Sequence, residues 1–209
     1  MLYSQDRFSP LYISSQSEKF DFDKFDSIRI KKRNWATEMY QDSIRIYMEK
    51  RKNECFIQIN PPNEYFFINK NFNPDGRIYS KGLAFIYNGF NAGKWYYYNK
   101  SGNLEKTIDH DAPFTFTFEQ MLEFAKKEGV TFYRYPQNET QQHGNFRPML
   151  QRGVDEKSGE SWWKLSKQSN DPVQPDTSYK IEIIKVNGKT GKVISRELMD
   201  AKVFGTYED

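Results

Sequence analysis

Apolar and polar residues alternate along most of the first half of the chain, and this pattern predicts β-strands. Ile44, Ile46 and Met48 alternate with polar neighbours, so they can share the buried face of one strand. The expected strands are residues 26–30, 42–48, 55–59, 65–68, 77–87, 94–98 and 103–108. Residues 35–42 are compatible with a short helix or with a turn. Together these segments indicate an antiparallel sheet, preceded by a loosely packed arm.

A sequence repeat marks two of the expected turns. Phe72-Asn-Pro-Asp-Gly-Arg-Ile78 recurs as Tyr98-Asn-Lys-Ser-Gly-Asn-Leu104. Gly76 and Gly102 lie 26 residues apart (102 − 76), a spacing that suits one hairpin per copy. Glycine readily adopts the positive φ that a tight turn requires. The repeat therefore predicts two equivalent β-hairpins.

A helix is expected at residues 118–128. Thr117 and Gln120 form a capping-box pattern, the apolar residues that follow have helical spacing, and Gly129 suits the helix end. Further strands are expected at residues 130–135, 162–166, 179–186 and 192–198, with a long polar connection at 136–161.

These patterns predict an α+β protein in two parts. Residues 1–112 form an antiparallel β-sheet with hairpin repeats, and residues 113–209 form a helix with an antiparallel sheet. Pro113 marks the break between the parts.

Composition and charge narrow the class of protein. The net charge of +3, from 31 basic and 28 acidic residues, is too even to indicate nucleic acid as an obligate partner. A single cysteine, Cys55, excludes an internal disulfide and suits a reducing compartment. The chain contains no run of 18 apolar residues and no signal-peptide pattern at its start. We therefore expect the cytoplasm, or the periplasm or a lipoprotein if an export signal has been removed.

Candidate chemistry in the sequence is weak. Asp109 and Asp111 would share one face of a strand while His110 points to the other, which is poor geometry for a shared metal. The other histidine, His143, lies in the long polar connection. The chain has no nucleophile elbow and no phosphate-binding loop, because Asn187-Gly-Lys-Thr-Gly191 precedes an expected strand. We expect no enzyme activity, no metal and no cofactor. A hydrolase that uses His110 or His143 stays open as an alternative.

The repeat resembles a known family. The Asn-x-x-Gly-x-Ile/Leu turn and the strand Gly93-Lys-Trp-Tyr-Tyr-Tyr98 resemble the MORN-variant repeats of bacterial YwqK-type antitoxin proteins. The resemblance covers residues 72–108, and it implies a β-ribbon that neutralises a toxin. The helix at 118–128, the strands that follow it and the hairpin Lys185-Val-Asn-Gly-Lys-Thr-Gly-Lys-Val-Ile194 resemble a PepSY-type module. That resemblance also implies binding, and neither family implies a set of catalytic residues.

We therefore expect an immunity or antitoxin-type protein that neutralises a cognate bacterial toxin or secreted effector by protein–protein contact. Interface anchors are enriched in Trp, Tyr and Arg. The candidate contact residues are Phe90, Tyr97, Trp163, Arg147 and Arg152. Because the chain lacks an acidic bias, we expect a toxin that is not a basic nuclease. An envelope-associated structural or scaffold protein stays open as the other alternative.

Overall fold

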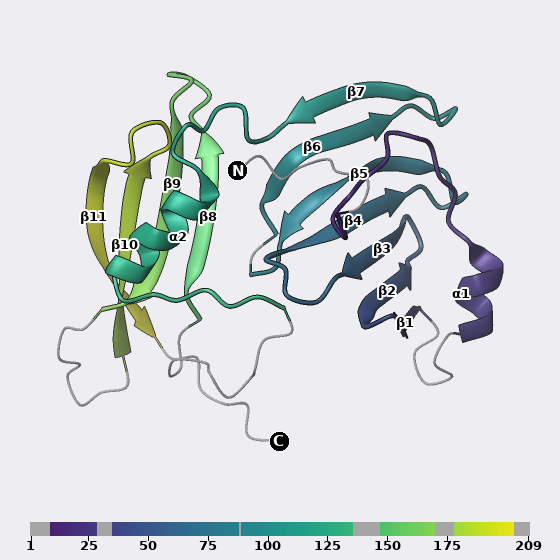
Figure 1. Ribbon diagram of the computed structural model, residues 1–209, viewed down its shortest axis with the longest axis horizontal. Coiled ribbons are helices and arrows are strands. Elements are labelled where there is room, and N and C mark those ends of the chain that lie inside the picture. Colours follow the sequence, from purple (N-terminus) through teal and green to yellow (C-terminus); the bar gives the residue numbers. More distant parts are fainter. Residues whose placement is uncertain (1–8, 29–34, 88, 136–146, 170–177, 203–209) are drawn as a thin grey trace. The chain divides into compact units, whose positions relative to one another are not determined.

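The computed structural model describes residues 9–28, 35–87, 89–135, 147–169 and 178–202 (Figure 1). The chain forms two compact units. Unit 1 comprises Met1–Ala112 with Tyr133–Gln137, and unit 2 comprises Pro113–Phe132 with Asn138–Asp209.

Unit 1 is built on a seven-stranded antiparallel sheet in which each strand pairs with the next one along the chain. Its strands are β1 (Ala36–Gln41), β2 (Ile44–Lys50), β3 (Cys55–Asn60), β4 (Phe66–Phe72), β5 (Ile78–Phe85), β6 (Asn91–Tyr98) and β7 (Leu104–Asp109). This order needs only short hairpin connections, so β1 and β7 form the two edges.

The predicted repeat is a structural repeat. In the β4–β5 turn the amide of Asn73 donates to the carbonyl of Arg77 (2.8 Å), and in the β6–β7 turn the amide of Asn99 donates to the carbonyl of Asn103 (3.0 Å). Gly76 and Gly102 both adopt φ +82°, and the strand register shifts just before each turn. The two copies therefore form the same hairpin.

Residues 9–21, the part of the N-terminal segment that the structure describes, are packed against the sheet and do not form the expected loose arm. The amide of Phe20 donates to the carbonyl of Gly76 (2.8 Å), and Lys19 forms a β-bridge with Arg77. The segment leads into α1 (Phe22–Ile28), where the Asp21 carboxylate accepts from the amide of Lys24 (2.9 Å). The ring of Phe20 packs on Phe72 and also on Phe25, which is fully buried. The segment and α1 thereby cover one face of the sheet.

Unit 2 contains a four-stranded antiparallel sheet with one helix packed on it (Figure 1). The elements are α2 (Phe118–Lys127), β8 (Met149–Val154), β9 (Ser161–Gln168), β10 (Ser178–Asn187) and β11 (Val193–Lys202), and the strand order is β11-β10-β9-β8. The expected capping box is present: the Gln120 amide donates to the Thr117 hydroxyl (3.3 Å), and the Thr117 amide donates to the Gln120 side chain (2.8 Å). Trp163, Leu165, Leu150, Ile184, Val186 and Met121 are fully buried.

The expected α+β class is wrong. The described residues form eleven strands in two antiparallel sheets and two short helices, so the protein has a β-rich fold. The helices contain seven and ten residues, too few to form a layer comparable with the sheets.

Four local expectations also differ from the structure. Residues 22–28 form a helix where a strand was expected from residue 26, because the Asp21 cap and the spacing of Phe22 and Phe25 favour a helix. Residues 36–41 form a strand where a short helix or a turn was expected. Residues 130–135 do not form the strand that was expected there. The polar connection contains β8, which sequence alternation does not reveal because Leu150 is its only fully buried side chain.

Candidate functional site

The seven-stranded sheet has one face that is rich in amide and aromatic side chains. Residues directly opposite each other in an antiparallel sheet point to the same face. The strand register therefore places seven residues, one from each strand, in a single row: Ala36, Glu49, Phe56, Asn71, Ser80, Tyr97 and Lys106. The adjacent row on the same face contains Glu38, Tyr47, Gln58, Asn69 and Gly82. We call the surface formed by these two rows the polar face.

The opposite face of this sheet is covered by other parts of unit 1. Its corresponding row is Thr37, Met48, Ile57, Lys70, Lys81, Tyr96 and Thr107. The Thr37 hydroxyl donates to the carbonyl of Ile28 in α1 (2.7 Å), and the Lys81 ammonium donates to the carbonyl of Gln16 (2.5 Å). The N-terminal segment and α1 therefore lie on this side and leave the polar face to other contacts.

Hydrogen bonds between neighbouring side chains hold the polar face in place. Asn71 donates to Ser80 (3.0 Å), and the Tyr47 hydroxyl donates to Glu49 (2.8 Å). Arg45 donates to Glu38 (2.7 Å), and this hydrogen bond lowers the pKa of the Glu38 carboxyl. Side chains held in this way lose little conformational entropy when a partner binds.

Three aromatic rings of the polar face are half-buried, so part of each ring reaches the surface. Tyr47 and Phe56 pack together with ring centroids 5.6 Å apart, and Tyr97 lies 6.3 Å from the buried Trp95. Burial raises the pKa of Tyr97, so its hydroxyl stays protonated and available as a hydrogen-bond donor near neutral pH. Tyr47 and Phe56 were not recognised from the sequence. The signal available in the sequence was the alternation in the segments 56–60 and 67–71. It places the amides of Gln58 and Asn60, and of Asn69 and Asn71, on the same face as the phenylalanine that begins each segment.

The two candidate contact residues in unit 1 lie in different environments. Tyr97 belongs to the polar face. Phe90 is half-buried in an aromatic cluster, stacked on Phe85 (4.8 Å between centroids) and edge-on to Phe66 (6.2 Å). The structure places only Tyr97 among the residues of the polar face.

The three candidate contact residues in unit 2 also differ. Trp163 is fully buried and donates from its indole nitrogen to the carbonyl of Phe116 (3.1 Å), so its ring contributes no surface to a partner in this structure. The half-buried Arg152 places its guanidinium over the rings of Phe114 (4.8 Å) and Trp163 (5.3 Å). Arg147 is exposed. The five candidates are therefore divided between the two units.

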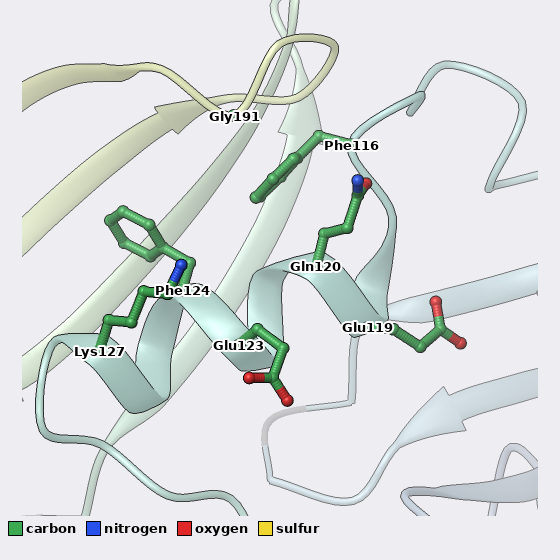
Figure 2. A pocket seen from close by; sticks show the side chains of 7 residues that line it. All are labelled: Phe116, Glu119, Gln120, Glu123, Phe124, Lys127 and Gly191. Carbon is green, nitrogen blue, oxygen red and sulfur yellow. The ribbon is translucent and has the colours of Figure 1, made fainter.

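Unit 2 has a shallow groove between α2 and the β10–β11 turn (Figure 2). Its volume is about 460 Å³, and it is lined by Phe116, Glu119, Gln120, Glu123, Phe124, Lys127 and Gly191. The rings of Phe116 and Phe124 lie on the side of α2 that faces the turn, whereas the Glu119 and Glu123 carboxylates point away (Figure 2). An apolar floor without converging acid and base groups suits binding of a side chain more than catalysis.

An ion-pair network connects the end of α2 to the sheet of unit 2. The Glu128 carboxylate lies 2.5 Å from Arg196 and 3.3 Å from Lys167. The Glu182 carboxylate contacts the same two cations, at 2.8 and 3.3 Å. The hydrogen bond from Arg196, together with Lys167, lowers the pKa of Glu128.

We expect this network to stabilise unit 2 only while Glu128 is ionised. Its pKa is lower in the folded state than its ordinary value of 4.5, so the stabilisation is complete above about pH 4.5 and is lost as the pH falls through the folded value. Glu128→Gln should therefore lower the melting temperature at pH 7, and the difference from wild type should be smaller at pH 3 than at pH 7. Thermal melts across this pH range test the expectation. Glu123→Gln, on the side of α2 away from the sheet, is the control and should lower the melting temperature little at either pH.

The described residues contain no group of three or more His, Cys, Asp or Glu side chains that could hold a metal ion. The His110 ring packs edge-on against Trp95 (6.2 Å), and His143 lies outside the described residues.

Cys55 is buried, and its burial raises the pKa of the thiol, which disfavours the reactive thiolate. The Asn187 side chain accepts hydrogen bonds from the amides of Lys189 (3.0 Å) and Thr190 (2.9 Å), as in a hairpin turn.

Within the described residues, neither helix is long and apolar enough to cross a membrane. The chain matches no protein-family model, no curated protein and no solved structure.

Proposed function

We propose that this protein is an immunity or antitoxin-type protein that neutralises a cognate bacterial toxin or secreted effector by protein–protein contact. The polar face of unit 1 makes the contact. The observation that supports this proposal is the arrangement of half-buried Tyr47, Phe56 and Tyr97 beside hydrogen-bonded amides, on the sheet face that the N-terminal segment and α1 do not cover. The resemblance of residues 72–108 to YwqK-type antitoxin repeats points to the same function.

The side of the sheet that contains the polar face is large enough for a protein partner. Seven strands at a spacing of about 4.8 Å span roughly 29 Å, and strands of six to eight residues are about 20–27 Å long. The whole side of the sheet that contains the polar face therefore measures roughly 600–800 Å², close to the ~800 Å² that each partner contributes to a standard interface. The aromatic anchors on β2, β3 and β6 would supply most of the binding free energy.

We expect replacement of these anchors to weaken the complex strongly. Phe56→Ala and Tyr97→Ala should each raise the Kd for the toxin by about tenfold or more, and the double variant by about 100-fold or more, because each change removes an aromatic anchor. The ligand is the product of the gene next to the gene for this chain, and binding is measured by calorimetry with the purified proteins. Growth of cells that express both proteins gives the functional readout.

Trp35→Ala is the matched control, because Trp35 is a large aromatic residue that is 49% exposed and lies outside both rows of the polar face. This variant should retain wild-type binding and protection. If the double variant still binds and protects as wild type does, the polar face is not the contact surface. If no neighbouring gene product binds, the proposed function is wrong.

We also propose that the toxin is not a basic nuclease. The chain carries a net charge of +3, whereas a partner for a strongly basic protein gains association rate from an acidic surface. Tight binding of a strongly basic nuclease would contradict this part of the proposal.

A further inference from the structure

Strand β11 forms an edge of the unit 2 sheet (Figure 1). This edge strand is long and carries exposed apolar side chains. It extends over ten residues, and its exposed apolar residues are Val193 (43%), Ile194 (51%), Leu198 (57%) and Met199 (53%). In the part of the chain that the structure describes, no strand pairs with its outer side. Natural edge strands are usually short, bulged or heavily charged, because an open edge pairs readily with another strand. The pairing of β11 with β10 has a register shift only near the start of β11, before Ser195, and the charged residues of β11 are of both signs, so residues 196–200 keep a regular edge. This edge is therefore suited to strand pairing.

The strand register shows which backbone groups face outward. The amide of Ser169 donates to the carbonyl of Lys180 (2.8 Å), so the backbone groups of Lys180 face β9 and those of Ile181 face β11. Ile181 lies opposite Met199, whose amide and carbonyl must therefore point to β10. By alternation, the amides and carbonyls of Arg196, Leu198 and Asp200 point away from the sheet and are available to another strand.

The geometry points to a symmetric dimer in which β11 of one copy pairs antiparallel with β11 of a second copy, centred on Leu198. A two-fold axis through this position places Leu198 opposite Leu198 of the second copy. It also places Glu197 opposite Met199 and Arg196, which contacts Glu128 and Glu182 in its own unit, opposite Asp200, so the facing positions bring together one apolar pair and two pairs of opposite charge. The two four-stranded sheets then form one continuous sheet with a self-complementary interface.

Neighbouring registers are less favourable. Centring the axis on Arg196 or on Glu197 places two like charges directly opposite each other, which destabilises a strand pair. Centring it on Met199 places Leu198 opposite Asp200, so that neither the Leu198 pair nor the two pairs of Arg196 with Asp200 can form. The charge pattern of β11 therefore selects the Leu198 register for a second copy of this chain.

The mass of the intact chain in solution, measured by sedimentation equilibrium, tests the proposal. We expect a mass of twice the 24.9 kDa of the chain, reduced to 24.9 kDa by Leu198→Lys, which brings two ammonium groups together at the axis. Val154→Lys is the control, because Val154 is 42% exposed on β8, the other edge of the same sheet. This variant should remain dimeric. Circular dichroism must show that both variants are folded.

Cysteine cross-linking tests the register. In the proposed register Leu198→Cys places two thiols on directly opposite residues, within the Cα separation that a disulfide accepts, whereas Glu197→Cys does not. Mild oxidation should therefore link the Leu198→Cys chains and leave the Glu197→Cys chains separate. A monomeric wild-type protein would overturn the proposal, and so would a dimer that Val154→Lys breaks and Leu198→Lys leaves intact. A chain that is monomeric alone and uses Leu198 only to bind a different protein would also overturn it.

Discussion

We expect Gly82→Ala to destabilise unit 1 by about 3–5 kcal/mol, the range observed when a large buried aromatic side chain loses its packing. The Trp95 indole lies directly over Gly82, and an added Cβ would be 2.2–2.3 Å from three of its atoms. The ring would have to leave its site, where its nitrogen donates to the carbonyl of Leu83 (2.9 Å). A change of this size is a large fraction of the stability of a typical domain. Urea unfolding followed by tryptophan fluorescence measures it.

Two further variants separate this clash from a general effect of removing a glycine. In a Trp95→Leu background the same Gly82→Ala substitution should be much less destabilising, because the clashing ring is absent. The difference between the two effects is the coupling free energy of Gly82 and Trp95, and we expect it to be about 2–3 kcal/mol. Gly159→Ala, where an added Cβ has no neighbour within 4 Å, should lower stability by only about 1 kcal/mol, because its φ of +69° disfavours alanine. Equal effects of Gly82→Ala in the two backgrounds would contradict the proposed packing.

We expect Glu18→Gln to destabilise unit 1 by about 3–5 kcal/mol, because it leaves a buried ammonium group without its counter-ion. Lys81 is fully buried, and Lys70 lies directly opposite it on β4. The Glu18 carboxylate bridges the two ammonium groups at 2.5 Å each. Burial alone would raise the pKa of Glu18, but the hydrogen bonds from Lys70 and Lys81 lower it overall. Thermal and urea unfolding of the variant measure the loss of stability.

A double-mutant cycle is the control for this prediction. In a Lys81→Met background the Glu18→Gln change should cost about 1 kcal/mol or less, because no buried cation is left unpaired. Lys81→Met alone should be tolerated better than Glu18→Gln, since methionine fills a similar volume without a charge. If Glu18→Gln has the same small effect in both backgrounds, Glu18 does not hold Lys81 in the sheet.

Features determined by nearby residues could be predicted from the sequence. The repeated Asn-x-x-Gly turn and the Thr117–Gln120 capping box each depend on hydrogen bonds within a few residues, and both are present in the structure. Strands β2 to β7 also lie close to their expected positions, because alternation of apolar residues is strong in these segments.

Features that depend on distant residues could not be predicted. Helix α1 replaces an expected strand, and its buried Phe25 packs on Phe20, which in turn packs on Phe72 of β4, a strand remote in sequence. Trp162 and Trp163 are equally aromatic in the sequence, and only the packing of α2 determines that Trp163 is the buried one. The Glu18 bridge to Lys70 and Lys81 spans more than 50 residues and has no local signal.

The polar face shows the same limit. Each strand contributes one or two of its residues, and only the register across the seven strands places Phe56, Asn71 and Tyr97 in one row. The sequence indicated Tyr97 as a contact residue through its aromatic neighbours, but it contained no sign of the amides and rings that accompany Tyr97. The surface therefore emerges from the pairing of strands and not from a motif.

Site-specific photo-cross-linking tests the central claim, contact through the polar face, most directly. A benzoylphenylalanine side chain is introduced in place of Tyr97 in one variant. In a second variant it replaces Lys24, an exposed residue of α1 on the covered side of the sheet. The variants are irradiated with the product of the neighbouring gene. We predict a covalent complex with the variant at position 97 and none with the variant at position 24. A complex formed only from position 24 would contradict the account.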